Sequence, residues 1–146
     1  MKSHINYKIF TDKKLVLEYF CGNLSWKDLM ENKRKLALEK NYDPTFNIID
    51  DVRDAFIVYS EDDIIKFADL INSTKKLNGN RKTAILTDTP NQLINSITLD
   101  TVKHTPFKLK TVSTLEAATK WVNAVSSDFQ FIKASLDELK KEAINS

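Results

Sequence analysis

The chain has 146 residues, which is enough for one domain built around one hydrophobic core. Hydrophobic residues make up 42% and charged residues 29%, a balance that excludes a disordered chain, and no apolar run approaches the roughly 18 residues of a transmembrane helix. The formal net charge of +2 comes from short, scattered basic groups, so we expect neither nucleic-acid binding nor membrane insertion.

The only cysteine is Cys21. A single cysteine cannot form an internal disulfide, which fits a reducing compartment. Residues 1–10 also lack the apolar centre of a signal peptide. We therefore expect a cytoplasmic protein in which Cys21 is a buried, inert thiol.

A β-hairpin opens the predicted fold. Residues 7–9 alternate apolar and polar side chains, a short polar turn follows, and residues 15–21 form a strong strand. The second strand has apolar side chains on both faces, which favours an inner position in the sheet. Glu18 is the exception to that pattern.

The first helix begins at Ser25, because Ser25 and Asp28 have the spacing of a capping box. We expect it to end before residues 41–44, since Pro44 disfavours helix in the residue that precedes it. The residues that follow helical spacing are Trp26, Leu29, Met30, Lys33, Leu36 and Ala37.

Residues 46–52 form the second core strand, and the apolar segment 56–59 after it is interpreted as a loop that exposes an apolar patch. Ser60 then caps a helix whose first turn is acidic, which suits the helix dipole. We expect this helix to stop at residues 78–79. Its predicted apolar stripe is Ile64, Phe67, Ala68 and Ile71.

Residues 82–87 form a third strand, followed by a helix with Thr89 as its cap and Gln92 at the capping-box position. The predicted buried side of this helix is Leu93, Ile94, Ile97 and Val102. Residues 107–111 alternate with lysines, which indicates a half-exposed edge strand.

Two helices close the chain. Ser113 and Glu116 form a capping box for a short helix. Ser127 is expected to cap the last helix, which runs to Ile144. Its apolar residues form a narrow stripe that packs either on its own domain or against a partner copy. The stripe is Phe129, Ile132, Leu136, Leu139 and Ala143.

This order of elements predicts an α/β fold with a mixed, mostly parallel five-stranded sheet. An N-terminal β-hairpin supplies the antiparallel strand, and the remaining strands are parallel with right-handed crossovers and helices packed on the sheet. We expect residues 1–125 to form this α/β domain. The additional amphipathic C-terminal helix, residues 126–146, belongs to the same domain.

The chain resembles the STAS domain, the SpoIIAA-like fold of the bacterial anti-sigma-factor antagonists. Three segments carry the resemblance: residues 24–29 after the hairpin, residues 46–60 from the second core strand to a helix start, and residues 113–118. Together they span about residues 5–125. The chain is similar to a divergent, uncharacterised STAS-like group.

In the antagonists, a serine at the start of the helix after the second core strand is phosphorylated by a partner kinase. Ser60 matches that position, so the resemblance implies a phosphorylation switch there. The family has a small Ser-Gly-Leu-type sequence at this point, whereas Ser60 is followed by Glu61, Asp62 and Asp63. The other interpretation is that Ser60 is only a helix cap.

Few residues indicate chemistry. Asp50, Asp51 and Asp54 lie near a strand end, where they could hold a magnesium ion or instead pair with Arg53 and Lys82. The histidines, His4 and His104, have no neighbours at metal-ligand spacing. We predict no catalytic residue, no metal and no cofactor.

The leading functional hypothesis is a non-enzymatic STAS-like binding or interaction module in bacterial regulation. Its partner is a protein or a second copy of the chain, and a homodimer through helices is the expected form of self-association. The alternatives are a carrier of a small ligand or lipid in an apolar pocket, a phosphorylation-regulated antagonist, and a hydrolase or transferase that uses Asp50 or Asp51. The candidate interaction or ligand face consists of Asp51, Phe56, Tyr59, Ser60 and Phe67.

Overall fold

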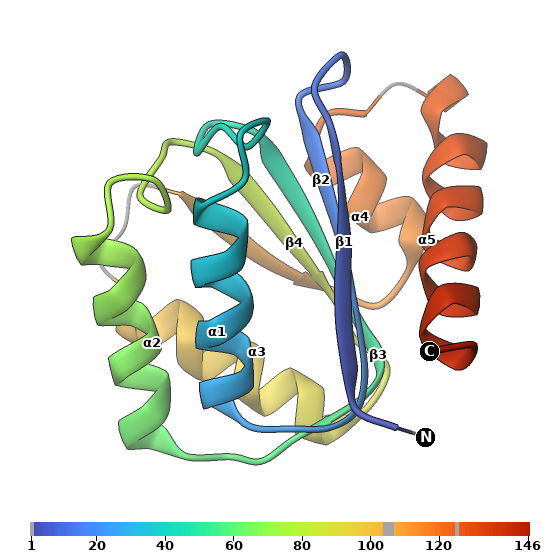
Figure 1. Ribbon diagram of the computed structural model, residues 1–146. Coiled ribbons are helices and arrows are strands. Elements are labelled where there is room, and N and C mark those ends of the chain that lie inside the picture. Colours follow the sequence, from blue (N-terminus) through green and yellow to red (C-terminus); the bar gives the residue numbers. More distant parts are fainter. Residues whose placement is uncertain (1, 104–106, 125) are drawn as a thin grey trace.

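The computed structural model describes residues 2–103, 107–124 and 126–146. It shows one sheet with helices on both faces (Figure 1). The strands are β1 (His4–Phe10), β2 (Leu15–Leu24), β3 (Asn47–Ile57), β4 (Lys82–Leu86) and β5 (Lys108–Val112). The helices are α1 (Trp26–Ala37), α2 (Glu61–Ser73), α3 (Pro90–Val102), α4 (Leu115–Trp121) and α5 (Phe129–Ile144), with a single 3-10 turn (Ser126–Asp128) before α5.

The five strands are ordered β1-β2-β3-β4-β5 across the sheet. β1 is antiparallel to β2, and every other neighbouring pair is parallel. This confirms the predicted mixed α/β fold and its N-terminal hairpin. Because β2 to β5 are parallel, their carboxyl ends meet at one edge of the sheet, which is where α/β folds place ligands.

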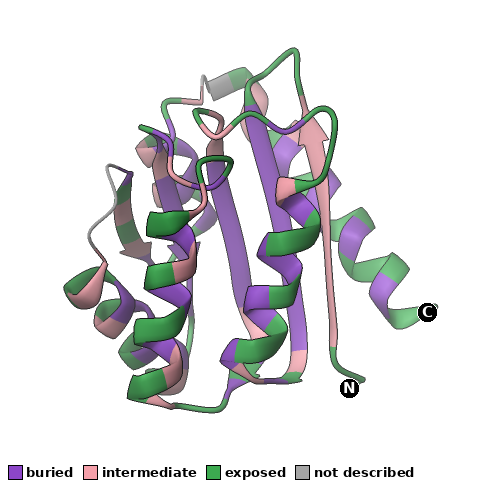
Figure 2. Ribbon diagram, turned by 60° about the vertical axis from the view of Figure 1, so that its left-hand side comes forward, coloured by how far each residue is buried: buried purple, intermediate pink, exposed green. Residues whose placement is uncertain are grey.

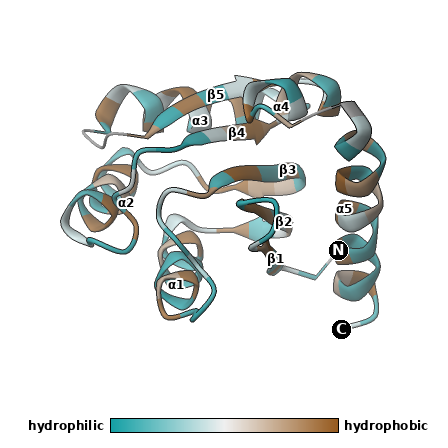
Figure 3. Cartoon of the chain, turned by 90° about the horizontal axis from the view of Figure 1, so that it is seen from above, coloured by the Kyte–Doolittle hydropathy of each residue, from teal (hydrophilic) through white to brown (hydrophobic). Residues whose placement is uncertain are grey.

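The sheet separates two hydrophobic cores. α1, α2 and α3 cover one face, and α4 and α5 cover the other, as the view along the layers shows (Figure 3). The apolar stripe of α5 lies in the second core: Ile132, Leu136, Leu139 and Ala143 are buried there. Figure 2 shows that the inner strands are buried along most of their length, while the outward turns of the helices are exposed.

The buried side of α3 was predicted wrongly, except for Val102, which packs against the core on the α1, α2 and α3 side of the sheet. Leu93, Ile94 and Ile97 face outward, and the side chains buried against the sheet are mainly polar: Gln92, Asn95, Ser96 and Leu99. The reason is that the inward polar groups find hydrogen-bond partners on β3, β5 and α1, so the apolar positions are not needed inside.

Three helix boundaries also differ from the expectation. Thr114, not Ser113, caps α4, because its hydroxyl accepts the hydrogen bond from Ala117 N. Ser127 lies inside the 3-10 turn, so α5 begins after Asp128, whose carboxylate pairs with Lys13 rather than capping the helix.

The third difference is the end of α2. The helix ends at Ser73, before the expected stop at residues 78–79, because Thr74 adopts an extended backbone. In the ranges that the structure describes, no helix has the length and apolar character needed to cross a membrane.

Candidate functional site

The inward face of α3 is held by polar contacts. Gln92 Nε2 donates to Arg53 O at 3.0 Å and to Ala55 O at 2.7 Å. Asn95 accepts a hydrogen bond of 2.8 Å from the Trp26 indole on α1 and donates to Ile57 O at 3.3 Å. These bonds satisfy buried polar groups that would otherwise be costly, and they fix α3 over the end of β3.

The outward face of α3 is apolar as far as Leu99, after which the exposed Asp100 carries a charge. Leu93, Ile94 and Ile97 are 44%, 52% and 52% exposed. No charged residue occurs from Thr89 to Leu99. A surface helix normally shows the opposite arrangement, with apolar residues inside and charged residues outside.

The loop after β3 adds to this surface. Asn91 bonds both backbone groups of Ile57, which ties the first turn of α3 to the end of β3. The next two residues, Val58 and Tyr59, are exposed. We call the set of exposed side chains from this loop and α3 the apolar platform: Val58, Tyr59, Leu93, Ile94 and Ile97.

The five residues predicted as an interaction face do not converge. Asp51 is buried and makes a two-pronged ion pair with Arg53, both bonds at 2.9 Å, on the side of the sheet covered by α4 and α5. Phe67 is buried on the opposite side, where its ring packs edge-to-face on Trp26 at 5.0 Å. Phe56 is exposed, but strand alternation directs it away from the core that holds Ile57.

Two of the predicted residues, Tyr59 and Ser60, lie next to each other at the start of α2. Ser60 caps α2, since its hydroxyl accepts a hydrogen bond of 3.3 Å from Asp63 N. Tyr59 belongs to the apolar platform. Of the predicted face, only Tyr59 and Ser60 lie together at the surface. The sequence analysis missed the exposed residues that α3 adds beside them.

A buried ionic cluster lies beneath α1. Lys33 Nζ donates to Glu18 Oε1, and Asn32 Nδ2 donates to Glu18 Oε2, each at 2.5 Å. On the neighbouring strand Asp50 is in register with Glu18, so two carboxyl groups lie side by side inside the protein. Two sequence signals pointed to this cluster: an acid on an apolar strand face, and a lysine among the apolar residues of the first helix.

The two carboxyl groups differ in their affinity for a proton. Burial raises the pKa of Asp50 well above its ordinary value, and the charge of Glu18 raises it further. Burial alone would raise the pKa of Glu18 too, but the Lys33 charge and the surrounding hydrogen bonds lower it. Asp50 therefore keeps its proton and shares it with an ionised Glu18.

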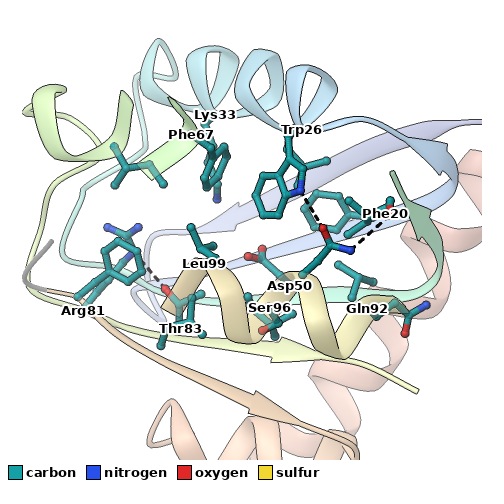
Figure 4. A pocket seen from close by; sticks show the side chains of 18 residues that line it. Phe20, Trp26, Lys33, Asp50, Phe67, Arg81, Thr83, Gln92, Ser96 and Leu99 are labelled. Atoms are coloured by element: carbon teal, nitrogen blue, oxygen red, sulfur yellow. Dashed lines mark hydrogen bonds between the residues drawn. The ribbon is translucent and has the colours of Figure 1, made fainter. Parts of the chain in front are cut away.

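A cavity of about 50 Å³ lies between the sheet and helices α1, α2 and α3. In Figure 4, Trp26, Lys33 and Phe67 reach into it from α1 and α2, toward Asp50 and Arg81 on the sheet side. It is much smaller than the roughly 300–1,000 Å³ of a typical small-molecule pocket. Phe67 is part of its lining, whereas Phe56 and Tyr59 are not.

A second hollow, of about 570 Å³, lies on the other face at the carboxyl ends of β3, β4 and β5. It is polar, and most of its charges are already paired: Arg53 with Asp51, Lys140 with Asp54 at 3.2 Å, and Lys133 with Asp137 at 3.3 Å. Tyr19 also donates to Asp54, at 2.5 Å.

The magnesium hypothesis needed Asp50, Asp51 and Asp54 together. Asp50 faces the cavity on one side of the sheet, and Asp51 and Asp54 face the polar hollow on the other. Among the residues that the structure describes, no group of three or more histidine, cysteine or acidic side chains is placed to hold a metal ion. The alternative interpretation, an ion pair between Asp51 and Arg53, is what the structure contains.

Comparison with known proteins identifies the fold. No family model matches the chain, and no curated protein does. A similar solved structure is the crystal structure of an uncharacterized protein from the DUF3478 family, with a SpoIIAA-like fold, from Shewanella loihica PV-4. The two share 16% sequence identity with a TM-score of 0.55, over 84% of this chain and 96% of that chain. The chain thus has a SpoIIAA-like fold, as its sequence resemblance predicted.

Proposed function

We propose that this chain is a non-enzymatic protein-interaction module, and that the apolar platform is the surface through which it binds its partner. The observation that carries the proposal is the reversed arrangement of α3, with hydrogen-bonded polar residues inside and large apolar residues outside. Exposed apolar patches of this kind mark interaction sites, because contact with a partner removes them from water.

The chemistry of the platform defines the partner. Neither the segment from Ala55 to Ser60 nor that from Thr89 to Leu99 carries a charge. The centres of protein interfaces are depleted in charge in the same way. The partner therefore presents an apolar, uncharged helix or loop. Five half-exposed side chains suit an interface at or below the roughly 800 Å² per partner of standard complexes, which favours a transient contact.

Two of the three alternative functions have specific observations against them. A lipid carrier needs an apolar volume well above the 50 Å³ of the cavity. A phosphate on Ser60 would lie beside Glu61, Asp62 and Asp63, and the Ser60 hydroxyl already caps α2. Like charges at that position oppose a phosphorylation switch.

The proposal is tested by placing a charge in the platform. The double variant Ile94→Lys/Ile97→Lys is compared with the wild type and with the control Ile144→Lys, which changes an equally exposed isoleucine on α5. Each protein is expressed in the host and crosslinked, and the proteins captured by each are quantified by mass spectrometry. We expect a defined partner with the wild type and the control, and at least about a tenfold loss with the double variant.

The proposal also requires that the purified partner binds the wild type directly, and that its affinity for the double variant is lower by the same factor. If every captured protein is retained equally by all three chains, the platform is not the interaction surface. Light scattering of the purified chain separates a second copy from a different partner, because self-association would appear without any added protein.

A further inference from the structure

The cavity beneath α3 contains one polar atom whose hydrogen-bonding need is unmet. Asp50 Oδ1 is buried and has no partner within the described part of the chain. The other polar side chains around it are bonded: Trp26 to Asn95, Gln92 to β3, and Ser96 to Thr111. A buried acceptor without a donor is costly, so a hydrogen-bond donor that reached Asp50 Oδ1 would be stabilising.

Two cations line the same cavity with donors to spare. Arg81 is buried, and to the residues that the structure describes it makes three hydrogen bonds with its five N–H groups, to Thr83 Oγ1, Pro44 O and Leu77 O. Lys33 makes one with its three, to Glu18. The polar end of the cavity therefore offers donors from Arg81 and Lys33 and an acceptor from Asp50.

We propose that this cavity is a binding site for a small aliphatic alcohol, whose hydroxyl group donates to Asp50 Oδ1 and accepts from Arg81 or Lys33. The site goes beyond the proposed interaction function and does not depend on it. A hydroxyl suits both needs because it carries one donor and two acceptor lone pairs. An ammonium group cannot accept and would be repelled by the two cations, and a carboxylate cannot donate to Asp50.

The remaining walls set the size and character of the ligand. They are apolar and largely aromatic: Phe20, Trp26, Phe67, Leu99 and Phe107. A water molecule needs roughly 10–15 Å³ by the same measure, so the cavity of about 50 Å³ holds about four non-hydrogen atoms. Three carbons and one hydroxyl, as in 2-propanol, match this volume.

The test uses the full chain and the probe 2-propanol, followed by NMR through the two tryptophan indole N–H signals. Trp26 lines the cavity, and its indole bonds Asn95. Trp121 packs on the opposite face of the sheet and does not line the cavity, although its indole bonds the backbone oxygen of Thr83, which does. We expect a saturable shift of the Trp26 signal with 2-propanol, a clearly smaller shift of the Trp121 signal, and no saturable shift with isopropylammonium or acetate.

Two variants of Asp50 predict opposite outcomes. Asp50→Asn keeps an acceptor oxygen and replaces the shared proton with an amide N–H toward Glu18, so binding of 2-propanol is retained. Asp50→Leu has a similar volume without the acceptor, so binding weakens about tenfold or more. Equal responses to the three probes, or an unchanged affinity in Asp50→Leu, would overturn the proposal. A crystal grown in 2-propanol that shows only water beside Asp50 would do the same.

Discussion

Lys33 and Glu18 form an ion pair from which water is excluded, since their side chains are 8% and 0% exposed. Removing one partner of such a pair leaves the other charge buried and uncompensated. We predict that Lys33→Met lowers the free energy of unfolding by about 3 kcal/mol. Urea denaturation measures the loss, and the control is Lys133→Met on α5, whose pair with Asp137 is exposed and is worth no more than about 0.5 kcal/mol.

The same pair gives a second, sharper comparison at the scale of single residues. The double variant Glu18→Leu/Lys33→Met removes both charges, so no group is left uncompensated, and we expect it to recover most of the stability lost in Lys33→Met. If the double variant is less stable than Lys33→Met alone, then Glu18 stabilises the fold even without Lys33. That result would contradict the view that the loss in Lys33→Met comes from an unpaired buried charge.

At the scale of elements, α3 is stabilised by its polar face, and its apolar face contributes little. Asn95→Leu would remove the acceptor of the Trp26 indole and leave that buried donor unpaired, while Ile57 O would keep its hydrogen bond from Asn91. We predict a loss of about 2 kcal/mol or more in the free energy of unfolding. Ile97→Asn, by contrast, changes an exposed position and shifts stability by less than about 0.5 kcal/mol.

Chemical denaturation of both α3 variants distinguishes this view from the usual amphipathic arrangement. In an ordinary surface helix the two results would be exchanged, because asparagine at an apolar position costs burial energy and leucine at a polar position costs little. An Ile97→Asn variant that is less stable than Asn95→Leu would contradict the outward placement of Ile97.

The elements differ in how far their sequence patterns could predict them. Strands such as β2 were predicted because they carry apolar side chains on both faces. A strand that is covered on both sides of the sheet requires this pattern. α3 could not be predicted in orientation, because periodicity assumes that apolar residues point inward, and Gln92 and Asn95 point inward only through partners on distant elements. The cap of α4 was missed by one residue, since both Ser113 and Thr114 are good caps.

At the scale of the whole molecule, the predicted site failed for a related reason. Asp51 lies on β3 and Phe67 on α2, and the sheet separates them: Asp51 faces the polar hollow on one side, whereas α2 packs Phe67 into the core on the other. Asp50 and Asp51 also diverge, because neighbouring strand positions face opposite layers. The buried cluster was indicated in part by Glu18 and Lys33, but its connection to Asp50 depends on the register of β2 and β3, which the sequence does not specify.

The second core layer depends on α5, which is outside the segment that resembles the STAS domain. Leu139 on α5 is fully buried against the sheet, whereas Ile144 at its end is exposed. We predict that Leu139→Ala lowers the free energy of unfolding by about 2–5 kcal/mol. Ile144→Ala, measured by the same denaturation curve, should change it by less than about 0.5 kcal/mol. Equal, small effects would mean that α5 is not an integral part of the domain.

The buried carboxyl pair also sets how the stability of the whole molecule varies with pH. The folded-state pKa of Asp50 is raised above its unfolded value of about 3.8, so above that pH the unfolded chain releases a proton that the folded chain retains. Stability contributed by Asp50 therefore declines as the pH rises from about 4 toward the raised pKa, by at most about 1.4 kcal/mol per pH unit. Glu18 acts in the opposite sense, because its lowered pKa gives stability that is lost as the pH falls below about 4.5.

The variant Asp50→Asn removes the contribution of Asp50 and leaves that of Glu18. Urea denaturation at several pH values should show that the free energy of unfolding of this variant, relative to that of the wild type, increases steadily above pH 4. If the two proteins instead show the same dependence on pH, Asp50 ionises normally in the folded protein.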